Sequence, residues 1–228
     1  MSVAPAHDPA TTLRVLSPAN GELVGEVGID SAEAVRAAVA RARLAQPAWG
    51  ARSVAERASI DALFASCDAG PGAPDVVVYN PSFRVRGPFL DLDPVEVKKT
   101  IDITAYGGFL VAQQALRRMV PKGKGVLLLT GASASVKGYA QSAPFAMGKF
   151  ALRGLAQSLA REFQPKNIHV AHFVIDGGIR APGKAAPVDQ PDSLLEPDAI
   201  ADSYFHVARQ PRSAWSWEIE LRPWVERF

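Results

Sequence analysis

Two short apolar segments and the amphipathic stretch between them dominate the middle of the chain. Residues 125–130 (GVLLLT) and 168–175 (IHVAHFVI) are apolar runs with polar or glycine boundaries, a pattern typical of strands buried on both faces. Between them, over residues 144–163, apolar residues recur at helical spacing with charged residues interspersed. Because parallel strands need a long crossover, this order predicts a right-handed strand–helix–strand unit in a covered parallel sheet.

A similar helical pattern lies before this unit. Residues 94–119 have apolar residues on one side and predict a long amphipathic helix. Gly107-Gly108 interrupts that helix at a cost of roughly 1 kcal/mol per glycine relative to alanine, which indicates close approach of a neighbouring element.

The two ends of the chain have patterns of their own. Residues 13–29 place two extended runs on either side of an Asn-Gly turn signal and predict a β-hairpin. Capping signals at Asp30-Ser31 and at Ser53 predict two helices after it. The C-terminal part predicts a proline- and aspartate-rich loop, a helix and a strand, over residues 181–198, 197–208 and 213–221.

Several motifs in the C-terminal three quarters stand in the order found in one enzyme family. They are TGASAS at 130–135, F-x-x-x-K at 145–149 and the IDGG loop at 175–178, preceded by the strand that ends at Asn80. Residues from about 57 to 228 thereby resemble the short-chain dehydrogenase/reductase family. The resemblance implies an α/β fold with an incomplete Rossmann-like parallel sheet and flanking helices, here preceded by an N-terminal β-hairpin and helices.

The family's catalytic positions are mostly altered here. In that family a tyrosine exchanges the hydroxyl proton, a lysine lowers its pKa and holds the nicotinamide ribose, a serine orients the substrate oxygen, and an asparagine completes a proton relay. The resemblance assigns the lysine to Lys149 and places Phe145, Ala132 and Thr104 at the tyrosine, serine and asparagine positions. A phenyl ring has no exchangeable proton, so acid–base help of roughly 10² to 10⁴ in rate has no donor there.

Two kinds of residue bear on whether a cofactor or substrate still binds. Ser133, Ser135 and Tyr139 lie in the same loop as Ala132 and are either substitute hydroxyls or ordinary polar loop residues. The resemblance assigns Asn80, Lys149 and Gly177 to cofactor binding. However, the family's T-G-x-x-x-G-x-G loop, whose helix receives the pyrophosphate, has no counterpart in the sequence. We therefore expect the affinity for NAD(P) to be severely reduced.

Two further features of the resemblance concern partners and ligands. In the family the helices corresponding to 94–119 and 144–163 form a subunit interface, which implies a homodimer or homotetramer, and the loop 181–198 resembles a mobile lid. Arg84 and Arg86 follow Asn80 in a loop that borders the substrate cleft. They either bind an anion or are exposed arginines without a ligand.

The N-terminal segment resembles a different family. Residues from about 13 to 60 are similar to the N-terminus of aldehyde dehydrogenases, but the segment stops well short of that family's catalytic residues and transfers no activity. We therefore predict an aldehyde-dehydrogenase-like hairpin and helix segment over 1–60 and a short-chain dehydrogenase/reductase-like domain, without its first strands, over 61–228.

Composition narrows the function classes. With 25 Lys and Arg against 23 Asp and Glu, the net charge of +2 is too balanced to attract nucleic acid by its field alone. The four histidines have no metal-ligand spacing, so no metal is expected, and His169 and His172 are interpreted as structural residues of a strand. The single Cys67 and the lack of a long apolar run indicate a cytoplasmic protein without a membrane span.

Two functional hypotheses follow. The first is a divergent family member without ordinary nicotinamide redox activity, that is, a dimeric small-molecule binder or pseudoenzyme. The alternative is an NAD(P)-dependent oxidoreductase that acts on a small alcohol or carbonyl with an altered proton relay.

Overall fold

A computed structural model describes residues 12–16, 23–28, 57–70 and 72–227 of the chain. The chain divides into two compact units, Met1–Trp49 and Gly50–Phe228, and each is described by itself.

The N-terminal unit contains the predicted hairpin. Strand β1 (Thr12–Leu16) pairs antiparallel with β2 (Leu23–Gly28), with Thr12 opposite Gly28. The prediction of a hairpin is confirmed, whereas its turn and the helix predicted from Asp30 lie outside the described residues.

The second unit is built on a parallel sheet of four strands in the order β3-β4-β5-β6. The strands are β3 (Val76–Tyr79), β4 (Gly125–Thr130), β5 (Ile168–Ile175) and β6 (Glu218–Leu221). This confirms the α/β class and the parallel Rossmann-like sheet. Every residue of β5 is buried, because β5 has a strand on each side and helices over both faces.

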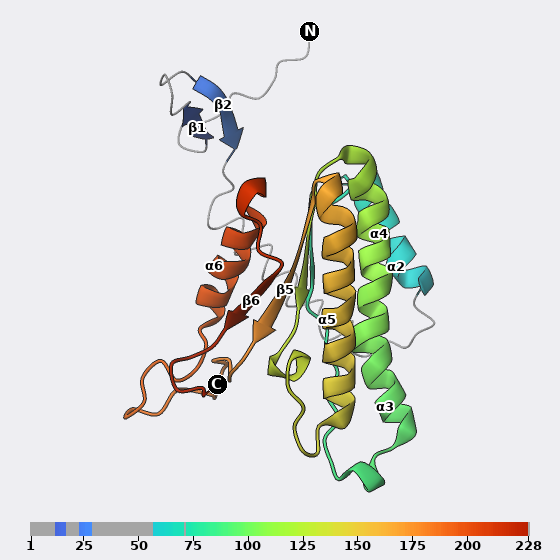
Figure 1. Cartoon of the computed structure of the whole chain (residues 1–228), viewed down its shortest axis with the longest axis vertical. Helices are drawn as coiled ribbons and strands as arrows, with labels where there is room; N and C mark the ends of the chain where they lie inside the picture. Colours follow the sequence, from blue (N-terminus) through green and yellow to red (C-terminus); the bar gives the residue numbers. More distant parts are fainter. Residues whose placement is uncertain (1–11, 17–22, 29–56, 71, 228) are drawn as a thin grey trace. The chain divides into compact units, whose positions relative to one another are not determined.

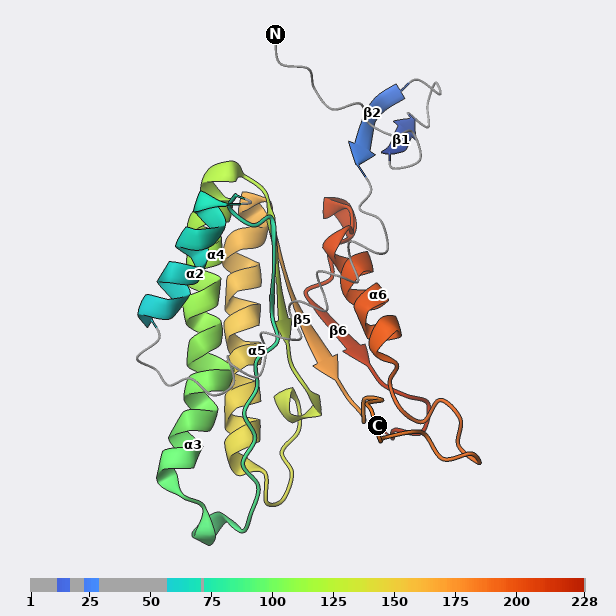
Figure 2. The ribbon, with the colours of Figure 1, turned by 180° about the vertical axis from the view of Figure 1, so that it is seen from behind.

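Helices cover both faces of this sheet (Figure 1). The described helices are α2 (Arg57–Ala69), α3 (Pro94–Ile101), α4 (Gly107–Lys122), α5 (Ala143–Phe163) and α6 (Pro197–Ala208). Helices α4 and α5 lie on one face and α6 lies on the other, while α2 packs outside α4, as the reverse view also shows (Figure 2). Short 3-10 turns span Phe89–Asp91, Ser133–Ser135, Gln164–Lys166 and Arg212–Ala214.

The two faces of the sheet have separate apolar cores. On the α6 side, Phe173 and Leu128 pack with Val207, and the Tyr204 ring stacks on Phe173 with centroids 3.6 Å apart. The α4 and α5 side buries small and large residues together, namely Ala112, Ala115, Leu116, Met119, Leu152 and Ala156. The alanines let both helices approach the strands closely, which explains the Ala-rich helical stripes.

The helix predicted over 94–119 is not one continuous α-helix. A π-helical turn, Asp102–Tyr106, joins α3 to α4, and the Tyr79 hydroxyl donates a hydrogen bond to the main-chain carbonyl of Ile103 in that turn. The close approach predicted at the two glycines is confirmed, because a Cβ on Gly108 would lie 2.7 Å from Leu152 Cδ1.

The C-terminal strand is shorter than predicted. Residues 213–217 do not belong to β6, which begins at Glu218. Trp215 instead stacks on His169 with ring centroids 4.7 Å apart, and its Nε1 donates to the carbonyl of Gln210. Aromatic packing and side-chain hydrogen bonds therefore replace strand pairing at these positions.

Candidate functional site

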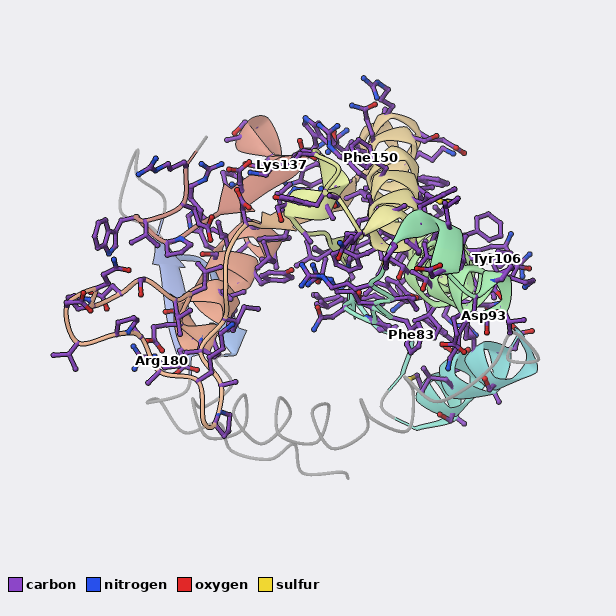
Figure 3. The ribbon with its side chains drawn as sticks, turned by 90° about the horizontal axis from the view of Figure 1, so that it is seen from below. Phe83, Asp93, Tyr106, Lys137, Phe150 and Arg180 are labelled. Carbon is purple, nitrogen blue, oxygen red and sulfur yellow. The ribbon has the colours of Figure 1, made fainter. Side chains whose placement is uncertain are left out.

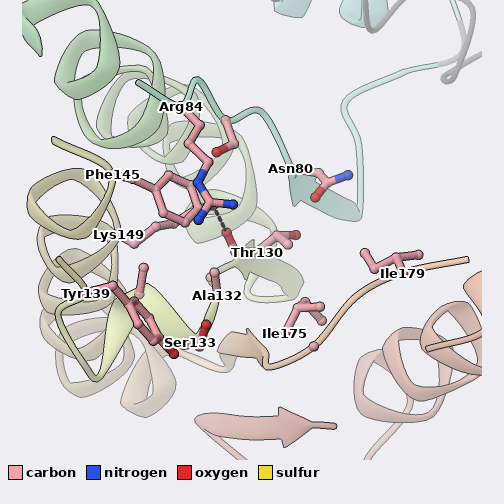
Figure 4. Close-up of a pocket in the computed structure, with 14 residues that line it drawn as sticks. Asn80, Arg84, Thr130, Ala132, Ser133, Tyr139, Phe145, Lys149, Ile175 and Ile179 are labelled. Carbon is pink, nitrogen blue, oxygen red and sulfur yellow. Dashed lines mark hydrogen bonds between the residues drawn. The ribbon is translucent and has the colours of Figure 1, made fainter. Parts of the chain in front are cut away.

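The predicted site residues converge where the parallel strands end. Figure 3 views this end of the molecule and labels Phe83 after β3, Lys137 after β4 and Arg180 after β5. The loops after these strands and the first turns of α5 enclose a pocket of about 280 Å³ (Figure 4). Seven of the residues proposed from the sequence line it, namely Asn80, Ala132, Ser133, Tyr139, Phe145, Lys149 and Gly177.

Lys149 is the buried cation of this pocket. Its side chain is only 2% exposed, and Nζ donates one hydrogen bond of 2.7 Å to the carbonyl oxygen of Thr130 (Figure 4). Burial lowers the pKa of the Lys149 ammonium from 10.5 to about 8. The helical pattern alone favours a solvated lysine, but the position on the sheet-facing side of α5 buries it.

Phe145 stands one helical turn before Lys149 and faces the same pocket. Its ring centroid lies 5.8 Å from Lys149 Nζ and 4.8 Å from the guanidinium carbon of Arg84. Both cations thus lie within reach of the phenyl ring, whose negative face attracts positive charge. It contributes no proton donor.

Hydrogen bonds to β5 and within the loop fix the start of the loop that follows β4. Gly131 N donates to the carbonyl of Phe173 at 2.7 Å, and Ala132 N donates to Ser135 Oγ at 3.1 Å. Ser135 is buried and does not line the pocket, whereas Ser133 is half-buried and does. Tyr139, at the far end of the loop, is 43% exposed.

Thr104 does not line the pocket. It is fully buried in the π-helical turn, where a Cβ on Gly148 would lie 2.9 Å from Thr104 Cβ. Its hydroxyl has no hydrogen-bond partner among the described residues. The position assigned to the family's asparagine is therefore occupied by a packing residue.

A network of buried and half-buried polar groups lies on the sheet behind the β4 loop. His172 Nδ1 lies 3.0 Å from Glu218 Oε2, and Arg153 donates two hydrogen bonds to the same carboxylate at 2.6 and 2.8 Å. Burial lowers the pKa of His172 to about 4, which keeps the ring neutral at pH 7. His169 is also buried, with Nε2 2.8 Å from the Ser216 carbonyl, as expected for structural histidines.

Sequence reasoning did not assign every residue of the pocket. Ser82, Thr130, Ile175 and Ile179 also line it, and the apolar isoleucines carry no chemical motif by which to find them. Arg84 was left open between an anion site and an exposed arginine; the structure places its side chain in the pocket lining and also leaves it exposed to solvent.

Neither a metal-binding cluster nor a membrane-spanning helix occurs in the part of the chain that the structure describes. There, no group of three His, Cys, Asp or Glu side chains is arranged to hold a metal ion. Among the same residues, no helix combines the length and apolarity needed to cross a bilayer.

Known proteins with related sequences include several dehydrogenases. A family model described as enoyl-(acyl carrier protein) reductase matches residues 19–201. The 3alpha-hydroxysteroid dehydrogenase of Mediterraneibacter gnavus is 30% identical over 180 residues, which cover 73% of this chain and 70% of that protein. The 2-dehydro-3-deoxy-D-gluconate 5-dehydrogenase of Formosa agariphila is 24% identical over 163 residues, which cover 72% of this chain and 58% of that protein.

One related protein is named for a ligand that it binds. The cyclic-di-GMP-binding biofilm dispersal mediator protein of Escherichia coli is 30% identical over 99 residues, which cover 43% of this chain and 41% of that protein.

Solved structures give the same family and fold. A short-chain dehydrogenase from Rhodopseudomonas palustris superposes with a TM-score of 0.62 at 34% identity, covering 74% of this chain and 70% of that chain. A 4-hydroxyisoleucine dehydrogenase complexed with NADH superposes with a TM-score of 0.64 at 22% identity over 76% of this chain and 79% of that chain, a likeness of fold alone. Family model, relatives and fold agree, and the chain belongs to the short-chain dehydrogenase/reductase family.

Proposed function

We propose that this chain binds a small organic molecule in the pocket beside Lys149 and does not carry out ordinary nicotinamide redox chemistry there. The observation that carries the proposal is the phenyl ring of Phe145, which lines the pocket 5.8 Å from Lys149 Nζ at the position of the family's tyrosine. With Ala132 at the serine position, the two side chains that polarise and protonate a substrate oxygen in the family are both apolar.

The pocket still fits one part of a nicotinamide cofactor. Lys149 Nζ uses one N–H for the Thr130 carbonyl, which leaves two donors for a ribose diol or another acceptor. Asn80 and Gly177 line the same space. A bound nicotinamide cofactor would supply a hydride, but Phe145 has no proton to deliver to the resulting alkoxide.

A ligand-binding role has a precedent among the relatives. The Escherichia coli relative is described as a cyclic-di-GMP-binding mediator of biofilm dispersal. It supports the idea that a chain of this family can act through binding.

A second candidate is an NAD(P)-dependent oxidoreductase of small alcohols or carbonyls with an altered relay. The observation that favours it is that Ser133 and Tyr139 line the same pocket as Lys149. In this mechanism the Tyr139 hydroxyl replaces the missing donor.

We also propose a homodimer or homotetramer that forms through the helical segments 94–119 and 144–163. Tyr106, Phe109, Met147 and Phe150 expose apolar side chains on these elements, between 40% and 54% of their surface. We further propose that residues 1–60 form an aldehyde-dehydrogenase-like segment and that the protein acts in the cytoplasm. Analytical ultracentrifugation that compares Phe150→Glu with the wild type tests this interface. A wild-type protein that sediments as a monomer would refute it.

The first experiment is calorimetric titration of the protein with NADH and NADPH, together with an activity screen on a carbonyl panel. We expect weak or absent binding and no turnover. NAD(P)H-dependent turnover by wild type would overturn the non-redox proposal and favour the second candidate, and loss of that turnover in Tyr139→Phe would identify the donor.

A gain-of-function variant tests the assignment of the relay. Phe145→Tyr combined with Ala132→Ser restores the two hydroxyls, whereas Phe150→Tyr adds a hydroxyl to an exposed residue of the same helix as a matched control. If the double variant binds NADPH and reduces carbonyls while the control does not, the relay positions are correct. A double variant that binds NADPH but stays inert contradicts the assignment.

A further inference from the structure

We propose that the ligand of this pocket carries a carboxylate, which the guanidinium of Arg84 binds above the ring of Phe145. The inference rests on the proposed ligand-binding function and adds the chemical class of the ligand. It concerns small carboxylic acids with an apolar or aromatic body.

The charge of the pocket lining is the first argument. Arg84 and Lys149 both line it, and no Asp or Glu is among the lining residues. Asp176 lies next to the lining residues in sequence, but Lys137 and Arg222 each approach its Oδ2 at 3.2 Å. The cations of the pocket therefore have no internal carboxylate to neutralise them, and an anionic ligand supplies that charge.

The second argument is the position of Arg84 itself. One face of its guanidinium rests on Phe145, with the carbon 4.8 Å from the ring centroid, and the side chain points over the space between Phe145 and Thr130 (Figure 4). Within residues 57–70 and 72–227, neither a carboxylate nor a carbonyl accepts a hydrogen bond from it. Stacking fixes the plane of the group while its N–H donors at the edge stay free, and a carboxylate matches that planar fork with two parallel hydrogen bonds.

Electrostatics around Arg84 point the same way. Burial, followed by repulsion from Arg86, lowers the pKa of the Arg84 guanidinium. Both effects disfavour the cation in the free pocket. A bound anion would offset both effects by its attraction to the guanidinium.

The walls and the size of the cavity limit the rest of the ligand. Phe145, Ile175 and Ile179 provide apolar surface around a volume of about 280 Å³, near the lower end of the range for small-molecule pockets. Ser82, Ser133 and Tyr139 add hydroxyl groups at the rim. This combination suits one carboxylate on a compact apolar body better than a highly charged phosphate ester.

The test compares acids with their neutral primary amides, which have nearly the same shape. We would titrate benzoate, phenylacetate and hexanoate, and then benzamide, phenylacetamide and hexanamide, into the wild type, Arg84→Gln, Arg84→Lys and Arg86→Gln. Arg86 is the matched control, because it lies two residues away in the same loop but does not line the pocket. Circular dichroism checks that each variant is folded.

We expect at least one acid to bind wild type at least tenfold more tightly than its amide, as charge-assisted bidentate hydrogen bonds allow. Arg84→Gln should abolish that preference, Arg84→Lys should retain a part of it, and Arg86→Gln should keep all of it. Equal binding of acid and amide, or an acid preference that persists in Arg84→Gln, would overturn the carboxylate proposal while the pocket keeps its binding role. Absence of binding for all three acids would also overturn it.

The two proposals fail separately. Acid-selective binding through Arg84 together with NADPH-dependent turnover would leave the carboxylate site standing and refute the non-redox function.

Discussion

Replacing Lys149 with methionine removes the only buried ammonium of the pocket and leaves a side chain of similar length. In the wild type this ammonium is 2% exposed and has one hydrogen bond, to the Thr130 carbonyl. Burial lowers its pKa from 10.5 to about 8, so the charged form is disfavoured in the folded state relative to the unfolded chain.

The sign of the effect follows from proton counting. Below pH 8 both states hold the proton, whereas between pH 8 and 10.5 the unfolded state holds it and the folded state has lost it. The free energy of unfolding should therefore rise with pH in this window, by about 1.4 kcal/mol per pH unit. Between pH 7 and about pH 9.5, the wild type should gain about 2 kcal/mol relative to Lys149→Met.

The assay is urea unfolding followed by tryptophan fluorescence at several pH values between about 7 and 9.5. The quantity of interest is the difference in the free energy of unfolding between wild type and Lys149→Met, because the contributions of the other titrating groups cancel in that difference. Lys166→Met is the matched control, because Lys166 lies just after the same helix with 49% of its side chain exposed. Parallel stability profiles for wild type and Lys149→Met would refute the argument that Lys149 is desolvated.

Two other changes have effects whose direction the structure fixes. In Gly154→Ala, in α5, the added Cβ would have no neighbouring atom within 4 Å, so the substitution should raise the free energy of unfolding by about 0.5–1 kcal/mol. In Gly148→Ala the added Cβ would lie 2.9 Å from Thr104 Cβ, so the free energy of unfolding should fall by about 1–3 kcal/mol. Chemical denaturation measures both, and equal effects would contradict the packing. Burial holds the pKa of His172 at about 4, below its ordinary 6.5, so stability should fall by about 3 kcal/mol as pH drops through that interval. His172→Gln should reduce this loss of stability at acid pH, and an unchanged loss would show that another group causes it.

The central part of the fold was predictable because its signals are local. The apolar runs of β4 and β5 and the helical stripe of α5 each lie in one continuous segment, and the observed bounds differ from the predicted ones by a residue or less. The short C-terminal strand was overpredicted, because Trp215 follows the alternating pattern yet packs by stacking on His169.

The site was predictable only where a motif named its residues. Lys149 and Phe145 share one motif, and their spacing of four residues places both on one face of α5. The position of Arg84 depends on how the loop after β3 lies against α5, a contact between residues 61 positions apart that no local pattern encodes. The pairing of Glu218 with His172 and Arg153 was missed for the same reason.

The π-helical turn of Asp102–Tyr106 also bears on how this region can change during evolution. Such a turn holds one residue more than the regular helix that would replace it, and each residue of a helix corresponds to about 100° of rotation. Deleting one residue there would convert the turn into regular α-helix and leave α3 nearly in phase with α4, because the turn already absorbs the extra residue. The contacts that would readjust are those of the turn itself, namely the hydrogen bond from the Tyr79 hydroxyl to the Ile103 carbonyl and the packing of Thr104 against Gly148. A single-residue deletion in this turn should therefore preserve the orientation of α3, whereas the same deletion inside α4 would rotate α3 by about 100° relative to the part of α4 that packs on the sheet.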